Sequence, residues 1–204
     1  MWIERPPKLF RKLFPGALFR IEPGESAPKV YLTFDDGPIP EVTPWVLDTL
    51  DVYGIKATFF MVGQNIERNP DLLEEVIKRG HKVGNHTHRH IRGIGISPQE
   101  YMEDVEACAR LADTSLFRPP HGWLTPGQLK AVEGKYKIVM YDLVTRDYSK
   151  KITAEEVSAN VRKYARAGSI IVFHDSLKSF EKLKTALPES IEWLAGQGYE
   201  FALI

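Results

Sequence analysis

Two neighbouring carboxylates, Asp35 and Asp36, lie in the stretch TFDDGP at residues 33–38. The apolar and β-branched residues 29–32 before them predict a strand, and the Gly-Pro pair after them cannot continue it. Neighbouring side chains on a strand point to opposite faces, so both acids can serve one site only where the strand breaks. The simplest alternative is an Asp-Gly turn with two solvated acids, which is the usual role of such a dipeptide.

A pair of histidines four residues apart, His86 and His90, supplies a second kind of ligand. In a helical turn this spacing puts both imidazoles on one side, and His88 between them points away and is predicted not to be a ligand. Two histidines and a carboxylate can hold a divalent metal and leave positions open for water and substrate. Surface histidine pairs are also common. However, five of the 6 histidines, all except His81, lie in segments that follow predicted strands.

The elements that must position these residues alternate along the chain, which predicts a parallel α/β fold with about seven strands. A barrel and an open doubly wound sheet both fit this alternation, and both place their chemistry at the carboxyl ends of the strands. We expect strands at 29–32, 56–62, 81–84, 116–118, 136–141, 169–173 and 199–204. We expect helices at 42–53, 69–80, 97–112, from 125 onward, 153–167 and 179–195, the last with a bend at Pro188.

Sequence patterns at the helix ends support these boundaries. Gly54 fits a C-terminal cap, and Asn69 fits an N-terminal cap followed by proline. Capping boxes are expected at Ser97 and Thr153. Further polar segments follow the later strands, at 118–122, 142–147 and 174–175. Candidate site residues therefore gather at one predicted face.

Composition excludes some classes of function. A chain of 204 residues with 43% hydrophobic residues fits one globular domain. The 27 basic and 27 acidic side chains give no net charge, which argues against a dedicated nucleic-acid-binding protein. Cys108 is the only cysteine, so no internal disulfide forms, and we expect it to be a small buried residue on a helix. The sequence does not indicate an oligomeric state.

The first twenty residues are basic, aromatic and interrupted by prolines. They contain no uninterrupted apolar segment, so we expect neither a signal peptide nor a transmembrane span. We expect residues 1–28 to form an arm packed on a catalytic domain at 29–204, and loose docking of the arm to an anionic membrane is the alternative. The expected location is cytoplasmic or peripherally membrane-associated.

Taken together, four motifs resemble those of the polysaccharide deacetylase family, the NodB-homology domain of carbohydrate esterase family 4. They are Thr33-Phe34-Asp35-Asp36-Gly37, His86-Thr87-x-x-His90, Arg118-x-Pro120-x-Gly122 and Val172-Phe173-His174, in family order. The resemblance covers residues from about 30 to 175. It implies an incomplete, distorted (β/α) barrel.

The resemblance also implies a role for each matched residue. Asp36, His86 and His90 would bind one divalent metal, usually zinc. Asp35 would be the general base and His174 the general acid. Arg118 would pair with Asp35, and Asp147 would orient His174. Candidate substrate-binding residues are Pro120, His121, Gly122, Trp123 and Tyr148.

The chemistry of N-deacetylation needs these residue types. A metal polarises the amide carbonyl and acidifies water, a carboxylate accepts the water proton, and an imidazolium protonates the leaving amine. Two positions depart from the family pattern. Asp147-Tyr148 replaces the usual Asp-Trp pair, with Asp142 as a rival for the acid. His121 replaces an aromatic residue. Trp123 and Leu124 fit either the cleft lining or ordinary packing.

Three functions therefore compete. The first is a metal-dependent deacetylase acting on an N-acetylated sugar, glycan or glycolipid. The second is an amidase of the same fold acting on a non-glycan amide or imide, since fold does not fix substrate. The third is a catalytically silent carbohydrate-binding relative, which the retained base, ligands and acid disfavour. An iron oxygenase is rejected because the carboxylate precedes both histidines in a TFDDG turn. An intracellular sugar precursor or a membrane-associated glycolipid fits better than an extracellular polymer.

Overall fold

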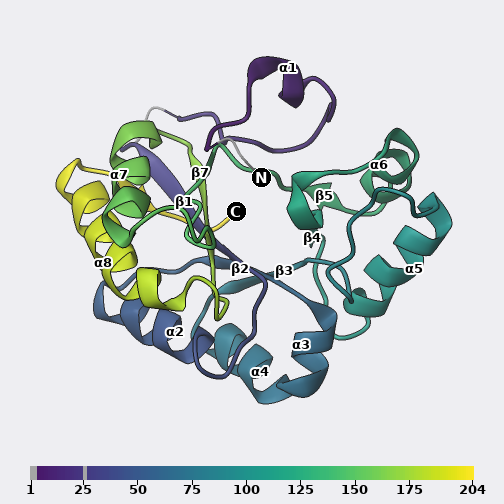
Figure 1. Cartoon of the computed structure of the whole chain (residues 1–204), viewed down its shortest axis with the longest axis horizontal. Coiled ribbons are helices and arrows are strands. Elements are labelled where there is room, and N and C mark those ends of the chain that lie inside the picture. The colour runs from purple at the N-terminus through teal and green to yellow at the C-terminus, as the bar shows by residue number, and fades with distance from the viewer. Residues whose placement is uncertain (1–3, 25–26) are drawn as a thin grey trace.

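The computed structural model of the chain describes residues 4–24 and 27–204. Seven parallel strands form one sheet in the order β5-β4-β3-β2-β1-β7-β6, and β8 pairs with the start of β1. Helices surround the curled sheet (Figure 1). The predicted α/β fold with about seven parallel strands is confirmed, and the arrangement is the incomplete barrel. The strands are β1 (Lys29–Asp35), β2 (Thr58–Met61), β3 (Lys82–Asn85), β4 (Leu116–Phe117), β5 (Lys137–Ile138), β6 (Leu143–Val144), β7 (Ile170–His174) and β8 (Glu200–Phe201).

The predicted helices are present, with shorter ends in most cases. They are α2 (Thr43–Val52), α4 (Pro70–Lys78), α5 (Pro98–Ala109), α6 (Pro126–Glu133), α7 (Ala154–Tyr164) and α8 (Phe180–Gly196). The structure adds α1 (Lys8–Arg11) and α3 (Gly63–Arg68), which were not predicted. The Thr153 capping box forms in both directions, and the Ser97 hydroxyl accepts from the Glu100 amide. Pro188 lies inside the continuous α8.

Several local predictions were wrong. Helix α3 and strand β6 were not expected, and β8 has two residues where a strand over 199–204 was predicted. Asn69 stands at the N-cap of α4, but its side chain makes no capping bond. Its Nδ2 instead donates to the Asn65 and Pro38 carbonyls, because the chain before α4 is already helical.

The central strand β1 aligns the ends of its neighbours. Asp35 lies opposite Phe60 of β2 on one side and His174 of β7 on the other. The rings of Phe34, Phe59 and Phe173 stack on the helix-facing side, with centroids 5.0 and 6.0 Å apart. Apolar packing therefore fixes the strand that carries the two acids, and the register brings His174 beside Asp35.

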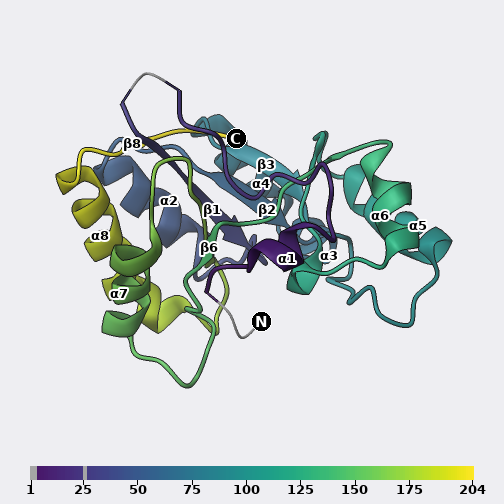
Figure 2. The same cartoon turned by 90° about the horizontal axis from the view of Figure 1, so that it is seen from above.

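The N-terminal arm crosses the open side of the sheet between its two edge strands, β5 and β6 (Figures 1 and 2). The Leu18 amide donates to Ile138, and the Val144 amide donates to Glu4, both at 2.8 Å. Gly168 packs under the arm with φ +81°, where a Cβ atom would lie 1.8 Å from the Ile21 carbonyl oxygen. The arm thus pairs with backbone groups of the two edge strands that the incomplete barrel leaves without a strand partner.

Within the ranges 4–24 and 27–204, no helix has both the length and the apolar character needed to cross a bilayer.

Candidate active site

The two acids of the TFDDGP stretch reach one pocket because β1 ends between them. Asp35 is the last residue of β1, and Asp36 has a left-handed backbone with φ 85°. The Gly37 amide donates to Asp175 Oδ1 at 3.0 Å, and a Cβ atom at Gly37 would lie 2.0 Å from Asp175 Oδ2. Glycine is therefore required at this turn by the close approach of Asp175.

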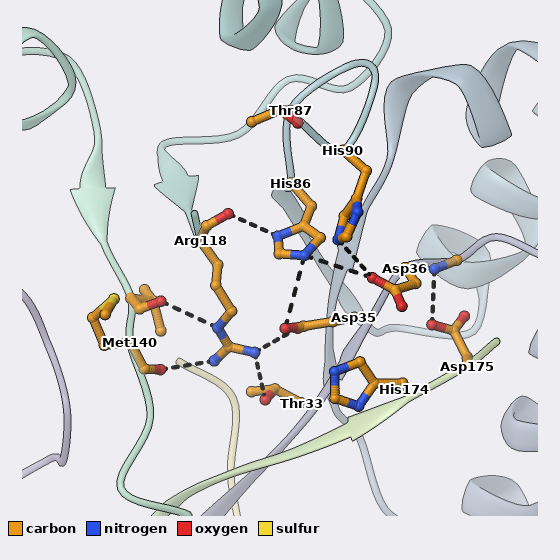
Figure 3. A network of polar contacts seen from close by, with 12 residues as sticks. Thr33, Asp35, Asp36, His86, Thr87, His90, Arg118, Met140, His174 and Asp175 are labelled. Atoms are coloured by element: carbon orange, nitrogen blue, oxygen red, sulfur yellow. Dashed lines mark hydrogen bonds and ion pairs between the residues drawn. The ribbon is translucent and has the colours of Figure 1, made fainter. Parts of the chain in front are cut away.

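Asp36, His86 and His90 form a compact donor cluster (Figure 3). Their ligand atoms lie within 4.8 Å of one another, and this is the one such cluster among the residues that the structure describes. Asp36 Oδ1 lies 3.1 Å from His90 Nε2 and 3.7 Å from His86 Nε2. One carboxylate oxygen and two imidazole nitrogens facing each other fit a divalent ion such as zinc.

The two histidines are not on a helical turn, so that prediction was wrong. His86 directly follows β3, and the loop bends through left-handed residues at Thr87 (φ 63°) and His90 (φ 53°). The Thr87 amide donates to Asn85 Oδ1, and the Thr87 hydroxyl accepts from the Ile91 amide. A hydrogen-bonded loop therefore brings both rings to the same side.

His88 lies away from the cluster, with Nε2 3.6 Å from the Glu67 carboxylate.

The protonation of His86 suits a metal ligand. Its Nδ1–H donates to the Arg118 carbonyl at 2.7 Å, which leaves Nε2 directed at Asp36. A bond of this kind fixes the tautomer of a ligating histidine. Burial lowers the pKa of His86 to about 4, so the ring is neutral at physiological pH. Burial alone would raise the pKa of Asp36, but its bond to His90 and nearby imidazoles hold it well below the usual range.

Arg118 holds Asp35 from the other side. Its Nη1 lies 2.6 Å from Asp35 Oδ1 and also donates to the Thr33 hydroxyl at 2.8 Å. The remaining donors reach the Val139 and Met140 carbonyls at 3.1 and 3.0 Å (Figure 3). Asp35 Oδ2 faces His86 Nε2 at 3.9 Å. One Asp35 oxygen is therefore fixed, and the other faces the donor cluster.

His174 is supported by Asp147. His174 Nδ1 lies 2.8 Å from Asp147 Oδ1, and the His174 amide donates to Asp147 Oδ2 at 2.7 Å. Burial lowers the pKa of His174, but the Asp147 carboxylate, with Asp36 and Asp35, outweighs it and raises the pKa to about 9. The rival Asp142 instead binds arginines and Ser169.

A pocket of about 170 Å³ is lined by Asp35, Asp36, His86, His90, Arg118 and His174. Of the predicted substrate-binding residues, His121, Gly122 and Tyr148 line it, and the Tyr148 ring packs edge-on to His174 at 4.8 Å. Pro119 lines the pocket, whereas the predicted Pro120 does not. Trp123 lines a neighbouring groove, and Leu124 is buried in a hydrophobic cluster.

Sequence reasoning gave no role to several supporting residues. Asp175 anchors the turn at Gly37 and also accepts from the Thr43 hydroxyl at 2.7 Å. Asn65 Nδ2 donates to the Asp36 carbonyl at 2.7 Å, and Lys178 adds a cation to the pocket lining. Two indications were available: Asp175 directly follows His174 at a strand end, and Thr33 shares a face of β1 with Asp35. Asn65 reaches the site through tertiary contacts.

Comparison with known proteins identifies the family. The family model for polysaccharide deacetylase matches residues 23–136. The chain belongs to the polysaccharide deacetylase family. A peptidoglycan-N-acetylglucosamine deacetylase of Bacillus cereus is 34% identical over 183 residues, which cover 86% of this chain and 85% of that protein.

Solved structures of the family have the same architecture. A peptidoglycan N-acetylglucosamine deacetylase in complex with 4-naphthalen-1-yl-N-oxidanyl-benzamide matches with a TM-score of 0.84 and 30% identity, over 98% of this chain and 95% of that one. A family 4 acetyl xylan esterase from Clostridium thermocellum, in complex with a cobalt ion, matches with a TM-score of 0.76 and 33% identity, over 85% and 87% of the two chains.

Proposed function

We propose that this protein is a metal-dependent hydrolase that removes the N-acetyl group from an N-acetylated sugar or glycan. The observation that carries the proposal is the placement of three groups around one pocket. These groups are the Asp36, His86 and His90 cluster, the Asp35–Arg118 pair and the His174–Asp147 pair. The similarity to a peptidoglycan-N-acetylglucosamine deacetylase supports the acetamido sugar as the substrate class.

The proposed metal ligands are Asp36, His86 and His90. Their donor set suits zinc or another divalent ion, and the neutral His86, with Nδ1–H held by a carbonyl, presents Nε2 as a ligand. When bound, such an ion polarises the amide carbonyl and acidifies water. The cobalt ion in the related acetyl xylan esterase is consistent with a divalent ion in this family.

Asp35 acts as the general base in this proposal. Its Oδ1 is held by Arg118, so Oδ2, which faces the donor cluster, is the oxygen that accepts the proton from water. Arg118 has its own donors occupied by Asp35, Thr33 and two backbone carbonyls. It therefore fixes the direction in which Asp35 presents its free oxygen.

His174 acts as the general acid. Because Nδ1 is engaged with Asp147, the proton for the leaving amine comes from Nε2. The Asp147 carboxylate fixes the tautomer and stabilises the imidazolium, in agreement with the raised pKa of His174. Base and acid come from adjacent strands, with Asp35 and His174 paired in register.

The test is release of acetate by the full chain after removal of metal and reloading with zinc. The substrates are N-acetylated chitooligosaccharides, an acetylated xylan and a non-glycan acetamide. The proposal expects zinc-dependent release of acetate together with free amine from the chitooligosaccharides. Release from the xylan alone would identify an esterase like the cobalt-bound relative. Release from the acetamide alone would identify an amidase, and sugar binding without release would identify a silent relative.

A further inference from the structure

A second cavity, which we call the arm groove, opens beside the catalytic pocket and has a volume of about 370 Å³. The N-terminal arm contributes Pro6, Pro7 and Phe10 to its walls, and Ile94 and Trp123 contribute from the body of the domain. Phe10 packs against Trp123 with ring centroids 6.2 Å apart. The arm, which spans the open side of the sheet, therefore also shapes a cavity next to the candidate active site.

The arm groove and the catalytic pocket meet at shared residues. His121, Gly122 and Tyr141 line both cavities. The His121 ring packs edge-on against His90 of the donor cluster, with centroids 4.8 Å apart. A ligand in the groove therefore lies one side chain away from the acetamido-sugar position, so a single molecule can occupy both cavities.

The arm groove suits an apolar chain better than a second sugar ring. Its apolar wall is formed by Pro6, Pro7, Phe10 and Ile94, whose side chains offer no hydrogen bonds to hydroxyl groups. The polar side-chain groups of the lining belong to Arg92, Trp123, His121 and Tyr141, and the last two also line the catalytic pocket. Burying a hydroxyl without a partner is unfavourable, whereas burying a methylene group there increases affinity about fourfold. The wall chemistry therefore matches a hydrocarbon chain.

One cation lines the arm groove. Arg92 is exposed and has no ion-pair partner among the residues that the structure describes. Arg92 lines the same groove as His121, and His121 is one of the residues that both cavities share. An arginine without an ion-pair partner in this lining matches a phosphate group, which arginine binds through paired hydrogen bonds.

The arm and the groove also carry exposed apolar side chains. Six large apolar side chains are exposed in the described part of the chain, and three of them are Leu9 and Leu13 on the arm and Ile94 in the groove. They are 75%, 53% and 56% exposed. Lys8 and Lys12 are exposed on the same short segment. Apolar and basic side chains together are typical of a surface that meets anionic amphiphiles.

We propose that the arm groove is a second substrate subsite that takes a hydrocarbon chain joined through a phosphate ester to the N-acetylated sugar. The substrate class is then an amphiphilic sugar phosphodiester rather than a bare glycan. This inference rests on the deacetylase function proposed above, because the sugar must occupy the catalytic pocket.

The first test compares two phosphodiesters of N-acetylglucosamine 1-phosphate, a decyl ester and a methyl ester, with the zinc-loaded full chain below the micelle concentration. The two carry the same sugar and charge. We expect kcat/KM to be at least tenfold higher for the decyl ester. Ile94→Asn should lower this ratio three- to tenfold. Ile77→Asn on α4, also 56% exposed, is the matched control and should leave it unchanged. Equal kcat/KM values in wild type would overturn the subsite.

The phosphate part is tested with Arg92→Gln. This variant should lower kcat/KM for the decyl phosphodiester about tenfold and leave the neutral decyl glycoside of N-acetylglucosamine nearly unaffected. Arg68→Gln, at an exposed arginine outside both cavities, is the control. An equal loss on both substrates would contradict a phosphate contact.

A binding measurement separates this inference from the proposed activity. Decyl phosphate is titrated into the full chain by calorimetry, which needs no turnover. Saturable binding weakened by both Ile94→Asn and Arg92→Gln supports the subsite even if no sugar is hydrolysed, in which case only the proposed deacetylase function fails. Hydrolysis of N-acetylated sugars without saturable decyl phosphate binding would overturn the subsite and leave the deacetylase intact.

Discussion

Asp35 and Asp142 are both buried acids paired with arginine, but their surroundings differ. All hydrogen bonds to Asp142 are internal: Oδ1 accepts from Arg11 and Arg166 at 2.6 and 2.7 Å, and Oδ2 accepts from Arg166 and Ser169 at 2.9 and 2.8 Å. Asp35 accepts one arginine bond at Oδ1 and turns Oδ2 toward the pocket. An acid with both oxygens satisfied can only hold structure together, whereas one with a free oxygen can also accept a proton.

The largest expected effect is from Asp35→Asn. This substitution keeps the size of the side chain but removes the proposed base, so kcat/KM should fall by about 10³-fold or more, toward the upper range for general acid–base catalysis. Zinc content measured by elemental analysis should stay near that of wild type, because the proposed ligand is Asp36. Loss of zinc in Asp35→Asn with retention in Asp36→Asn would mean that the two acids have exchanged roles.

His174→Ala tests the proposed acid on the neighbouring strand β7. We expect a loss of about 10²–10³-fold in kcat/KM. The acid works when protonated, and its pKa is raised to about 9, so wild-type kcat/KM should fall as the pH rises above about 9. The variant should lose this descending limb. His88→Ala is the control, since His88 faces Glu67 outside the pocket, and it should keep the limb. A descending limb that survives in His174→Ala would identify another acid.

Asp142→Asn makes the same kind of substitution at Asp142, where both carboxylate oxygens accept hydrogen bonds from the protein. Breaking a fully buried pair costs about 3–5 kcal/mol, and the partial exposure of Arg11 and Arg166, at 23% and 41%, reduces this to about 2 kcal/mol. Thermal unfolding should shift down by about 4–8 °C. The control Asp51→Asn, at a surface ion pair, should cost under about 1 kcal/mol. If Asp142→Asn protein is fully folded and still shows a large loss of kcat/KM, Asp142 has more than a structural role, and the comparison is contradicted.

The smallest effect is expected from Thr33→Val. Thr33 accepts from Arg118 and donates to the Ile171 carbonyl, so its loss should cost about 1 kcal/mol of stability and lower kcat/KM about threefold through Arg118. Thr145→Val is the matched control, because Thr145 donates to the next carbonyl of β7, Val172, at 2.9 Å and does not touch Arg118. It should lose similar stability without the change in kcat/KM. Equal losses of kcat/KM in both variants would show that Thr33 does not affect activity through Arg118.

The comparison also explains what the sequence could predict. Strand periodicity, turn residues and caps are local, so the alternating fold and the break after Asp35 could be read directly. Asp142 and Asp147 are only five residues apart after the same predicted strand. Only the tertiary contacts with Arg11, Arg166 and His174 separate a structural acid from one that supports the site.

The loop that carries the two histidines shows the same limit. The spacing of His86 and His90 correctly suggested that they lie together, but the helical turn inferred from it was wrong. The left-handed backbone of Thr87 and its hydrogen bond to Asn85 bring the rings together, and neither feature produces a periodic pattern in the sequence. The arm groove was equally hidden, because Phe10 and Trp123 meet only after the arm crosses the sheet.

The most direct test of the central claim is a zinc titration of the metal-free full chain, followed by acetate release from an N-acetylated chitooligosaccharide. We predict no release without metal and a rise that saturates at one zinc per chain in wild type. His86→Ala should show neither tight zinc binding nor release. Full acetate release from the metal-free protein, or wild-type zinc binding by His86→Ala, would contradict the account.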